Sequence, residues 1–301
     1  MNVYINGVVV GSEYRIQSAK ATDNAGGRGD ICEVVFPDAA KCGGFTNCDG
    51  DTLEIREGGY TTGVMRIDSV ERTSDGQYVM KAVSLPESAR ETGFGVYENV
   101  TLAQLLRAGA QEMGLKSALY GVNGDTLLRR VVRREQTWPE FLTMIFRMES
   151  AVIKFEGDSV LAIGYAWAFE QTPVRVLRDD GKGTYFQRQR FRTMMIRTGL
   201  IEATAKDSAA IGGMYKRQYN EQVYDMQQAK RAAKGYLLDA NLECEVYKCS
   251  MTLDTGIAAM NRIDLFGNHQ TAGNWYVHSV THEFKEKTTH LTLRRCIDTI
   301  K

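Results

Sequence analysis

The sequence TLEIREGGYTTGVMRIDSVERTSDGQYVMKAVSL, residues 52–85, indicates how the first part of the chain folds. Polar and apolar residues alternate in three runs, and β-branched residues are frequent, which is typical of half-buried strands. Gly58-Gly59 and Ser74-Asp75-Gly76 separate the runs with residues that favour turns. Short strands at this spacing, with no long helix between them, predict an antiparallel β-barrel. Because the run at 31–36 alternates in the same way, we expect this barrel to occupy residues 1–92.

Residues 93–168 predict a small α+β unit. Thr101-Leu-Ala-Gln104 and Thr137-Trp-Pro-Glu140 have the spacing of capping boxes, and apolar residues at helical spacing follow each of them. The run at 127–135 predicts a strand, and residues 151–164 predict a hairpin. The core of the unit is expected on one face of the second helix, formed by Trp138, Phe141, Leu142 and Ile145.

Residues 169–301 predict a return to strands. Alternating runs occur at 184–191 and 193–205, and four more lie between residues 242 and 296. A polar, alanine-rich helix is expected at about 220–238. The predicted fold is therefore mainly β with an α+β insert: two antiparallel β-barrel domains, at 1–92 and 169–301, flank the α+β middle domain at 93–168.

The charge balance and the composition exclude several classes of protein. Lys+Arg and Asp+Glu number 37 each among 301 residues, so the formal net charge is zero. Proteins that bind duplex nucleic acid usually carry a basic excess, because neutralising phosphates supplies most of their non-specific affinity. No apolar run approaches the roughly 18 residues that span a bilayer, and the start of the chain lacks the apolar core of a signal peptide. We expect no specific nucleic-acid binding, no membrane insertion and no secretion.

The cysteines and histidines do not form a recognisable metal motif. The six cysteines are Cys32, Cys42, Cys48, Cys244, Cys249 and Cys296. Their spacing fits no zinc ribbon or finger, and without a secretion signal we expect them to be reduced. His278 and His282 lie in a run of strand-forming residues, where four positions span about 13 Å, too far to share one ion. We predict no metal and no cofactor, and two histidines on one face of a strand with Tyr276, Val280 and Phe284.

No catalytic motif is complete. Gly157-Asp-Ser159-Val-Leu161 lacks the second glycine of a nucleophile elbow. The run at 179–184 lacks the first glycine of a P-loop, and the glycines at 26–29 precede a strand rather than a helix. No catalytic or cofactor-binding residue is therefore assigned, and the protein is predicted not to be an enzyme.

One basic segment has a candidate function. Arg188, Arg190 and Arg192 fall in a predicted strand at 184–192, where alternate side chains point the same way. Such a row is either a solvated, ion-paired face or a docking surface for an acidic partner or a channel wall. The three arginines are therefore candidates for a docking or channel face.

The order of these elements resembles that of contractile-tail baseplate hub proteins. GDTLEI (50–55), GVMRIDSVE (63–71) and YVMKAVSL (78–85) resemble the N-terminal barrel of that family, which includes phage late control protein D and is related to the hub part of type VI secretion valine-glycine-repeat spike proteins. NVTLAQLLRAGAQEMGL (99–115) resembles its middle segment. QQAKRAAKGYL (227–237) and GNWYVHSVTHEFKEKTTHLTLRRC (273–296) resemble its closing module. The Cys32/Cys42/Cys48 loop and residues 206–220 are departures from this pattern.

The resemblance implies a structural role. It implies a homotrimer whose subunits each supply two similar barrels, and which adapts the sixfold tail tube to the threefold central spike. Its expected partners are two further copies of itself, the tail tube protein, the central spike protein and other baseplate proteins. Its expected location is the virion tail baseplate or an injection particle assembled in the host bacterial cytoplasm, with the spike and any cell-wall hydrolase on separate chains.

Two alternatives remain open from the sequence. A tail-associated peptidoglycan hydrolase would need a cleft that holds an acid and a base. A monomeric carbohydrate-binding or adaptor β module would bind glycans without assembling.

Overall fold

The first 92 residues fold into short strands, as the alternation predicts. A computed structural model describes residues 1–38, 42, 50–219 and 222–301. The predicted strands at 31–36 and 52–57 coincide with β4 and β5. The elements of this N-terminal module are β1 (Asn2–Ile5), β2 (Val8–Val9), η1 (Ser12–Tyr14), β3 (Ser18–Asn24), β4 (Ile31–Phe36), β5 (Thr52–Glu57), β6 (Tyr60–Thr61), β7 (Met65–Arg72), β8 (Tyr78–Val83) and η2 (Glu87–Arg90).

The middle unit contains both predicted capping boxes. Thr101 Oγ1 accepts a hydrogen bond from Gln104 N (3.2 Å) and Thr137 Oγ1 accepts one from Glu140 N (3.3 Å), and each box closes reciprocally. The predicted core residues Trp138, Phe141, Leu142 and Ile145 are all buried, which confirms the helical face. The elements of the middle unit are β9 (Gly93–Thr101), α1 (Leu102–Glu112), β10 (Lys116–Tyr120), β11 (Leu127–Gln136), α2 (Trp138–Met148), β12 (Ala151–Glu156), β13 (Ser159–Gly164) and α3 (Tyr165–Glu170).

The last third of the chain differs from its prediction in two boundaries. The helix begins at Met226, since the Asp225 side chain accepts a hydrogen bond from Gln228 N (2.8 Å) and caps it. Residues 220–221, where the helix was expected to start, lie outside the described residues. The run at 193–205 is a hairpin of two strands. The elements are β14 (Arg175–Arg178), β15 (Thr184–Gln187), β16 (Thr193–Thr198), β17 (Ile201–Lys206), β18 (Tyr215–Tyr219), α4 (Met226–Leu242), β19 (Glu245–Thr252), β20 (Arg262–Phe266), β21 (Gly273–Glu283) and β22 (Thr288–Arg295).

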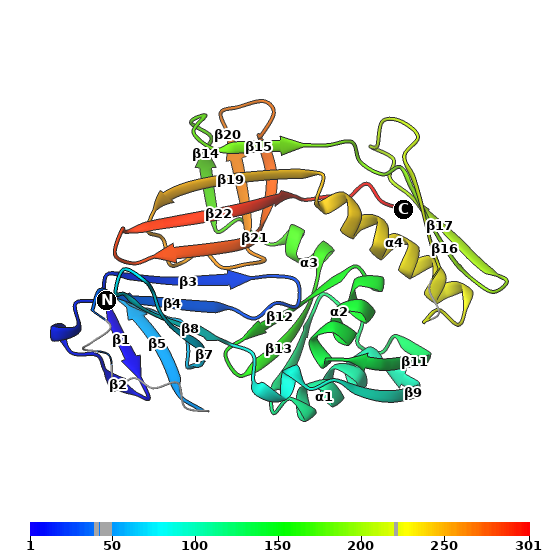
Figure 1. Ribbon diagram of the computed structural model, residues 1–301. Coiled ribbons are helices and arrows are strands. Elements are labelled where there is room, and N and C mark those ends of the chain that lie inside the picture. The colour runs from blue at the N-terminus through cyan, green and yellow to red at the C-terminus, as the bar shows by residue number, and fades with distance from the viewer. Residues whose placement is uncertain (39–41, 43–49, 220–221) are drawn as a thin grey trace.

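One large sheet joins the two ends of the sequence (Figure 1). Its strands run in the order β15-β19-β22-β21-β3-β4-β8-β7-β5-β1-β2, with β20, β14 and β6 paired at its sides. The antiparallel pair β3–β21 links the N-terminal module to the C-terminal module, which we define as β14, β15 and β19–β22. The ladders between described strands thus connect the two β modules through β3 and β21.

Three hydrophobic cores lie along this arrangement. One belongs to the N-terminal module, and a second belongs to the C-terminal module and includes the buried Trp275. The third and largest lies in the middle unit, and β16, β17 and α4 also bury their apolar residues there. A mainly β fold with an α+β insert is therefore confirmed. The domain boundaries after residues 92 and 168 stay a prediction.

Candidate functional site

The three candidate arginines do not share a strand. β15 ends at Gln187, and residues 188–192 form an irregular connection to β16. The connection leaves the strand path because the side-chain amide of Asn241 on α4 bonds both backbone groups of Phe191, accepting from its N–H (2.8 Å) and donating to its C=O (2.9 Å). The predicted strand at 184–192, and with it a single row of arginines, is wrong.

The arginines differ in their contacts. Arg190 is half-buried and donates to Glu245 (2.6 Å), with Asp207 at 3.8 Å. Arg188 is exposed and lies 3.3 Å from the Glu243 carboxylate, and Arg192 is exposed. Burial raises the pKa of Glu245, but hydrogen bonds from Arg295 and Arg190 outweigh it and hold that pKa below its usual range. Arg190 therefore belongs to a structural ion-pair cluster, while a docking role for Arg188 and Arg192 stays a prediction.

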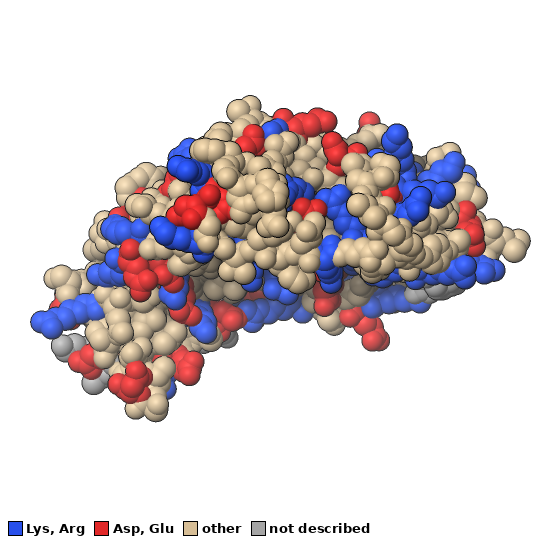
Figure 2. Space-filling view, turned by 90° about the horizontal axis from the view of Figure 1, so that it is seen from above, with Lys and Arg blue, Asp and Glu red and all other residues tan. Residues whose placement is uncertain are grey.

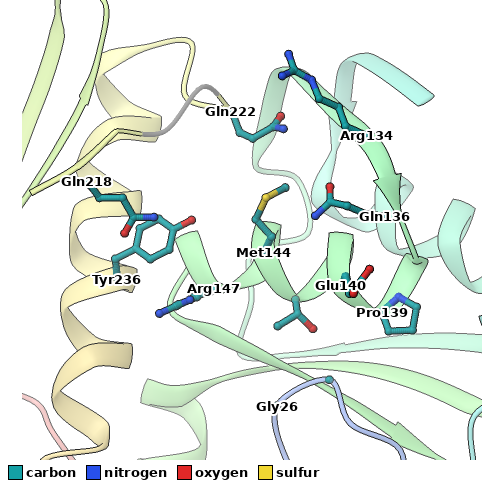
Figure 3. A pocket seen from close by; sticks show the side chains of 12 residues that line it. Gly26, Arg134, Gln136, Pro139, Glu140, Met144, Arg147, Gln218, Gln222 and Tyr236 are labelled. Carbon is teal, nitrogen blue, oxygen red and sulfur yellow. The ribbon is translucent and has the colours of Figure 1, made fainter. Parts of the chain in front are cut away.

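A cleft of about 850 Å³ opens beside α2 (Figure 3). Arg134 and Gln136 of β11 lie along one side of it, and Gln218 of β18 and Tyr236 of α4 lie along the other. Met144 of α2 lies between these two sides, and its thioether lines the cleft. Amides, an aromatic ring and a thioether are groups that contact peptides and side chains, and they supply no proton-transfer pair.

The charged groups of this cleft already make structural contacts. Glu140, the one carboxylate among the described residues that line it, accepts from Thr137 N (2.9 Å) and Oγ1 (3.0 Å). Arg147 pairs with Asp239 and stacks over the Tyr236 ring, with 5.0 Å from its guanidinium carbon to the ring centroid. The acid and base that a hydrolase needs are not brought together among these lining residues.

A buried ionic cluster joins three parts of the fold. Lys154 of β12 is 3% exposed in its side chain and lies 3.0 Å from Asp23 of β3. The other oxygen of Asp23 accepts from Ala259 N (2.8 Å), which precedes β20 in the C-terminal module. Asp30 lies beside this pair, and burial together with the charge of Asp23 raises its pKa to about 8. Since every part of the fold contributes a group, the cluster is a structural junction.

The histidines and cysteines have structural surroundings. His282 is buried and bonds Thr289 Oγ1 (3.0 Å), and the ladder between β21 and β22 shifts register at His278. No group of three metal-ligating side chains occurs in residues 1–38, 42, 50–219 and 222–301. The five described cysteines are free, and Cys48 of the Cys32/Cys42/Cys48 loop lies outside the described residues.

Exposed apolar side chains are the features that the sequence did not single out. They lie on edge strands and in the segments that connect strands, where little of the fold packs over them. The described residues contain no helix long and apolar enough to cross a membrane. The most exposed apolar side chains are Val8, Val64, Phe94, Val176, Leu200 and Ile211.

The fold is that of phage tail proteins. The tail protein from Neisseria meningitidis MC58 matches 98% of this chain and 95% of its own length, with a TM-score of 0.76 and 13% identity. The 43 kDa tail protein of prophage MuSo2 from Shewanella oneidensis matches 98% of this chain and 97% of its own, with a TM-score of 0.76 and 12% identity.

A component of the Escherichia coli type VI secretion system has the same fold over 97% of this chain and 76% of its own, with a TM-score of 0.58 and 11% identity. No family model matches the sequence, and neither does any curated protein. At these identities the similarity confirms the resemblance at the level of the fold, and function needs a separate argument.

Proposed function

We propose that this chain is a structural hub of a phage tail or a tail-like injection particle, acting as a homotrimer between the tube and the central spike. The observation that carries the proposal is the similarity to two phage tail proteins over 98% of the chain, through all of its modules. A shared element order over nearly the full length is more specific than a shared single module.

The arrangement of the modules supports this function. The N-terminal and C-terminal modules each have a core of their own and are joined by the β3–β21 ladder. A trimer of such chains presents six β modules around one axis, which suits a sixfold tube on one side and a threefold spike on the other. This adaptor role requires the two modules to be alike and to be related by roughly 60° about the trimer axis.

The cleft supports a structural role over a catalytic one. Its single carboxylate is used in a helix cap, and Arg147, one of its two arginines, is paired with Asp239. We therefore expect no peptidoglycan hydrolysis, and purified cell wall incubated with the chain should keep its turbidity.

The deciding experiment is electron microscopy of the assembled particle. We expect three copies on the tail axis between tube and spike, with the two modules of each copy alternating around it. A position away from the axis, or a copy number that is not a multiple of three, would contradict the proposal. A glycan-binding monomer would instead appear at the periphery of the particle.

A further inference from the structure

The three-stranded sheet β16–β18, named here the basic sheet, has one face that its own chain leaves uncovered. Met194, Ile196, Ala203 and Ala205 bury one face in the core that α4 shares. Arg197 and Glu202, which pair across the ladder, lie exposed on the opposite face. Tyr215 and Arg217 of β18 are also exposed there, and the Arg217 Nε donates to the Tyr215 hydroxyl (2.9 Å).

The hairpin β16–β17 projects beyond α4 and ends in an apolar residue (Figure 1). Gly199, at φ +52°, takes the first position of its two-residue turn, where a left-handed conformation favours glycine. Leu200 takes the second position, and its relative exposure is 103%. A single exposed leucine is common. Here it stands at the tip of a projecting hairpin, separated by one ladder pair from the pair that contains Arg197, and arginine is enriched in protein interfaces.

Charge is distributed unevenly along this neutral chain. Between residues 188 and 219 there are seven Lys and Arg but two Asp and Glu. Figure 2 shows basic side chains gathered at the end of the molecule that carries β16 and β17. Residues 1–92 have the opposite balance, with fourteen Asp and Glu against nine Lys and Arg.

The acidic N-terminal module lies at the other end of the molecule (Figure 1). Glu13 of η1, Glu71 of β7 and Asp75 of the β7–β8 turn are exposed, and their carboxylates make no ion pair with another described residue. The edge strand β2 in the same module exposes Val8 and Val9, at 69% and 53%. The module thus offers both an acidic surface and an apolar edge.

From this complementarity we infer that the basic sheet of one copy docks onto the N-terminal module of the next copy, head to tail, with Leu200 against apolar surface there. The inference rests on the proposed homotrimer and assigns its interface. An interface that places the same surface of two copies together would oppose basic sheet to basic sheet, which repels. Two different, oppositely charged surfaces on one chain instead build a ring, since each copy uses one surface on each side.

The test reverses charge at one end at a time. The first variant is Arg197→Glu with Arg217→Glu, the second is Glu71→Lys with Asp75→Lys, and a third chain carries all four changes. Lys230→Glu with Lys248→Glu is the control, because both lysines are exposed and lie on α4 and β19, outside the basic sheet and the N-terminal module. Far-ultraviolet circular dichroism and thermal melting establish that each variant is folded.

Sedimentation measures self-association at about 0.05 M and about 1 M salt. We expect each single-end variant to weaken assembly at least about tenfold, and the four-change chain to recover it. The control should assemble like the unmodified chain, and high salt should weaken assembly of the unmodified chain. A Leu200→Ser variant should also assemble less, at either salt concentration.

Two results would overturn the inference. One is unchanged assembly of both single-end variants. The other is an unmodified chain that stays monomeric up to about 1 mM at low salt. The binding free energy between the two surfaces would then be too small to hold copies of the chain together. Neither result contradicts the hub proposal, since that proposal is judged by copy number and axial position in the particle.

Discussion

At the residue scale, Trp138 is the centre of the middle unit. Its ring is 1% exposed, its Nε1 donates to Glu112 Oε2 (2.6 Å), and Arg133 stacks over it at 4.6 Å. Trp138→Ala should lower the free energy of unfolding by about 3–5 kcal/mol, because it leaves a large cavity. Trp167→Ala should cost much less, since that ring is exposed on α3. A loss under about 1 kcal/mol for Trp138→Ala in denaturant melts would show that this face does not form the core.

His278 gives the protein a predictable pH dependence. The pKa of His278 is lowered from 6.5 to about 4, mainly because the side chain is buried. The positive charges of Arg294 and Arg28 lower this pKa as well. The unfolded chain therefore binds a proton between these values when the folded chain does not, so stability is full above about pH 6.5 and falls as the pH drops towards 4. The loss is at most about 3 kcal/mol.

Urea unfolding at several pH values tests this prediction. His278→Gln should flatten the slope between pH 4 and 6.5, whereas His269→Gln, in an exposed turn, should leave it unchanged. An identical slope in the His278 variant and the unmodified chain would contradict it.

At the element scale, a glutamine side chain takes the place of a neighbouring strand at the edge of β11. The Gln222 amide accepts from Val132 N (2.8 Å) and donates to Val132 O (2.8 Å). Gln222→Leu should leave both buried backbone groups without a partner, at a cost of about 1–3 kcal/mol each. Hydrogen exchange of the Val132 amide should accelerate. Gln227→Leu, on the exposed face of α4, is the control, and equal effects of the two variants would refute the role of Gln222.

The sequence predicts elements best where the stabilising contacts are local. Both capping boxes and the Trp138 face were predictable, because their partners lie within a few residues along the chain. The irregular connection at 188–192 was not, since it depends on Asn241, about fifty residues later. The single histidine face was also wrong: Tyr276 and Val280 pack in different cores, because the register shift at His278 reverses the faces of β21.

At the scale of the whole molecule, the junction between modules has no signal in the sequence. Asp23 and Lys154 are 131 positions apart, and no local pattern pairs them. The same is true of the β3–β21 ladder, which joins residues about 260 positions apart. Local sequence patterns therefore do not predict which strands and side chains join the modules.

This continuity predicts cooperative unfolding of the modules. If the C-terminal module unfolded alone, β3 would lose its ladder to β21, and Asp23 would lose its bond from Ala259 N. If the middle unit unfolded alone, Gly26 and Gly27 would lose Ile153 O, and Asp23 would lose Lys154. Each partial state thus breaks hydrogen bonds and ion pairs that the modules make with one another, and each lost hydrogen bond costs about 0.5–1.5 kcal/mol.

Calorimetry checks this expectation. The unmodified chain should show one transition whose calorimetric and van't Hoff enthalpies agree. Lys154→Met should lower the midpoint of that transition, because the buried carboxyl group of Asp30 and the half-buried one of Asp23 lose their cation. Lys116→Met, at an exposed pair on β10, should change it little. Two separate transitions in the unmodified chain would instead show that the β3–β21 ladder and the Asp23 junction are too weak to make the modules one cooperative unit.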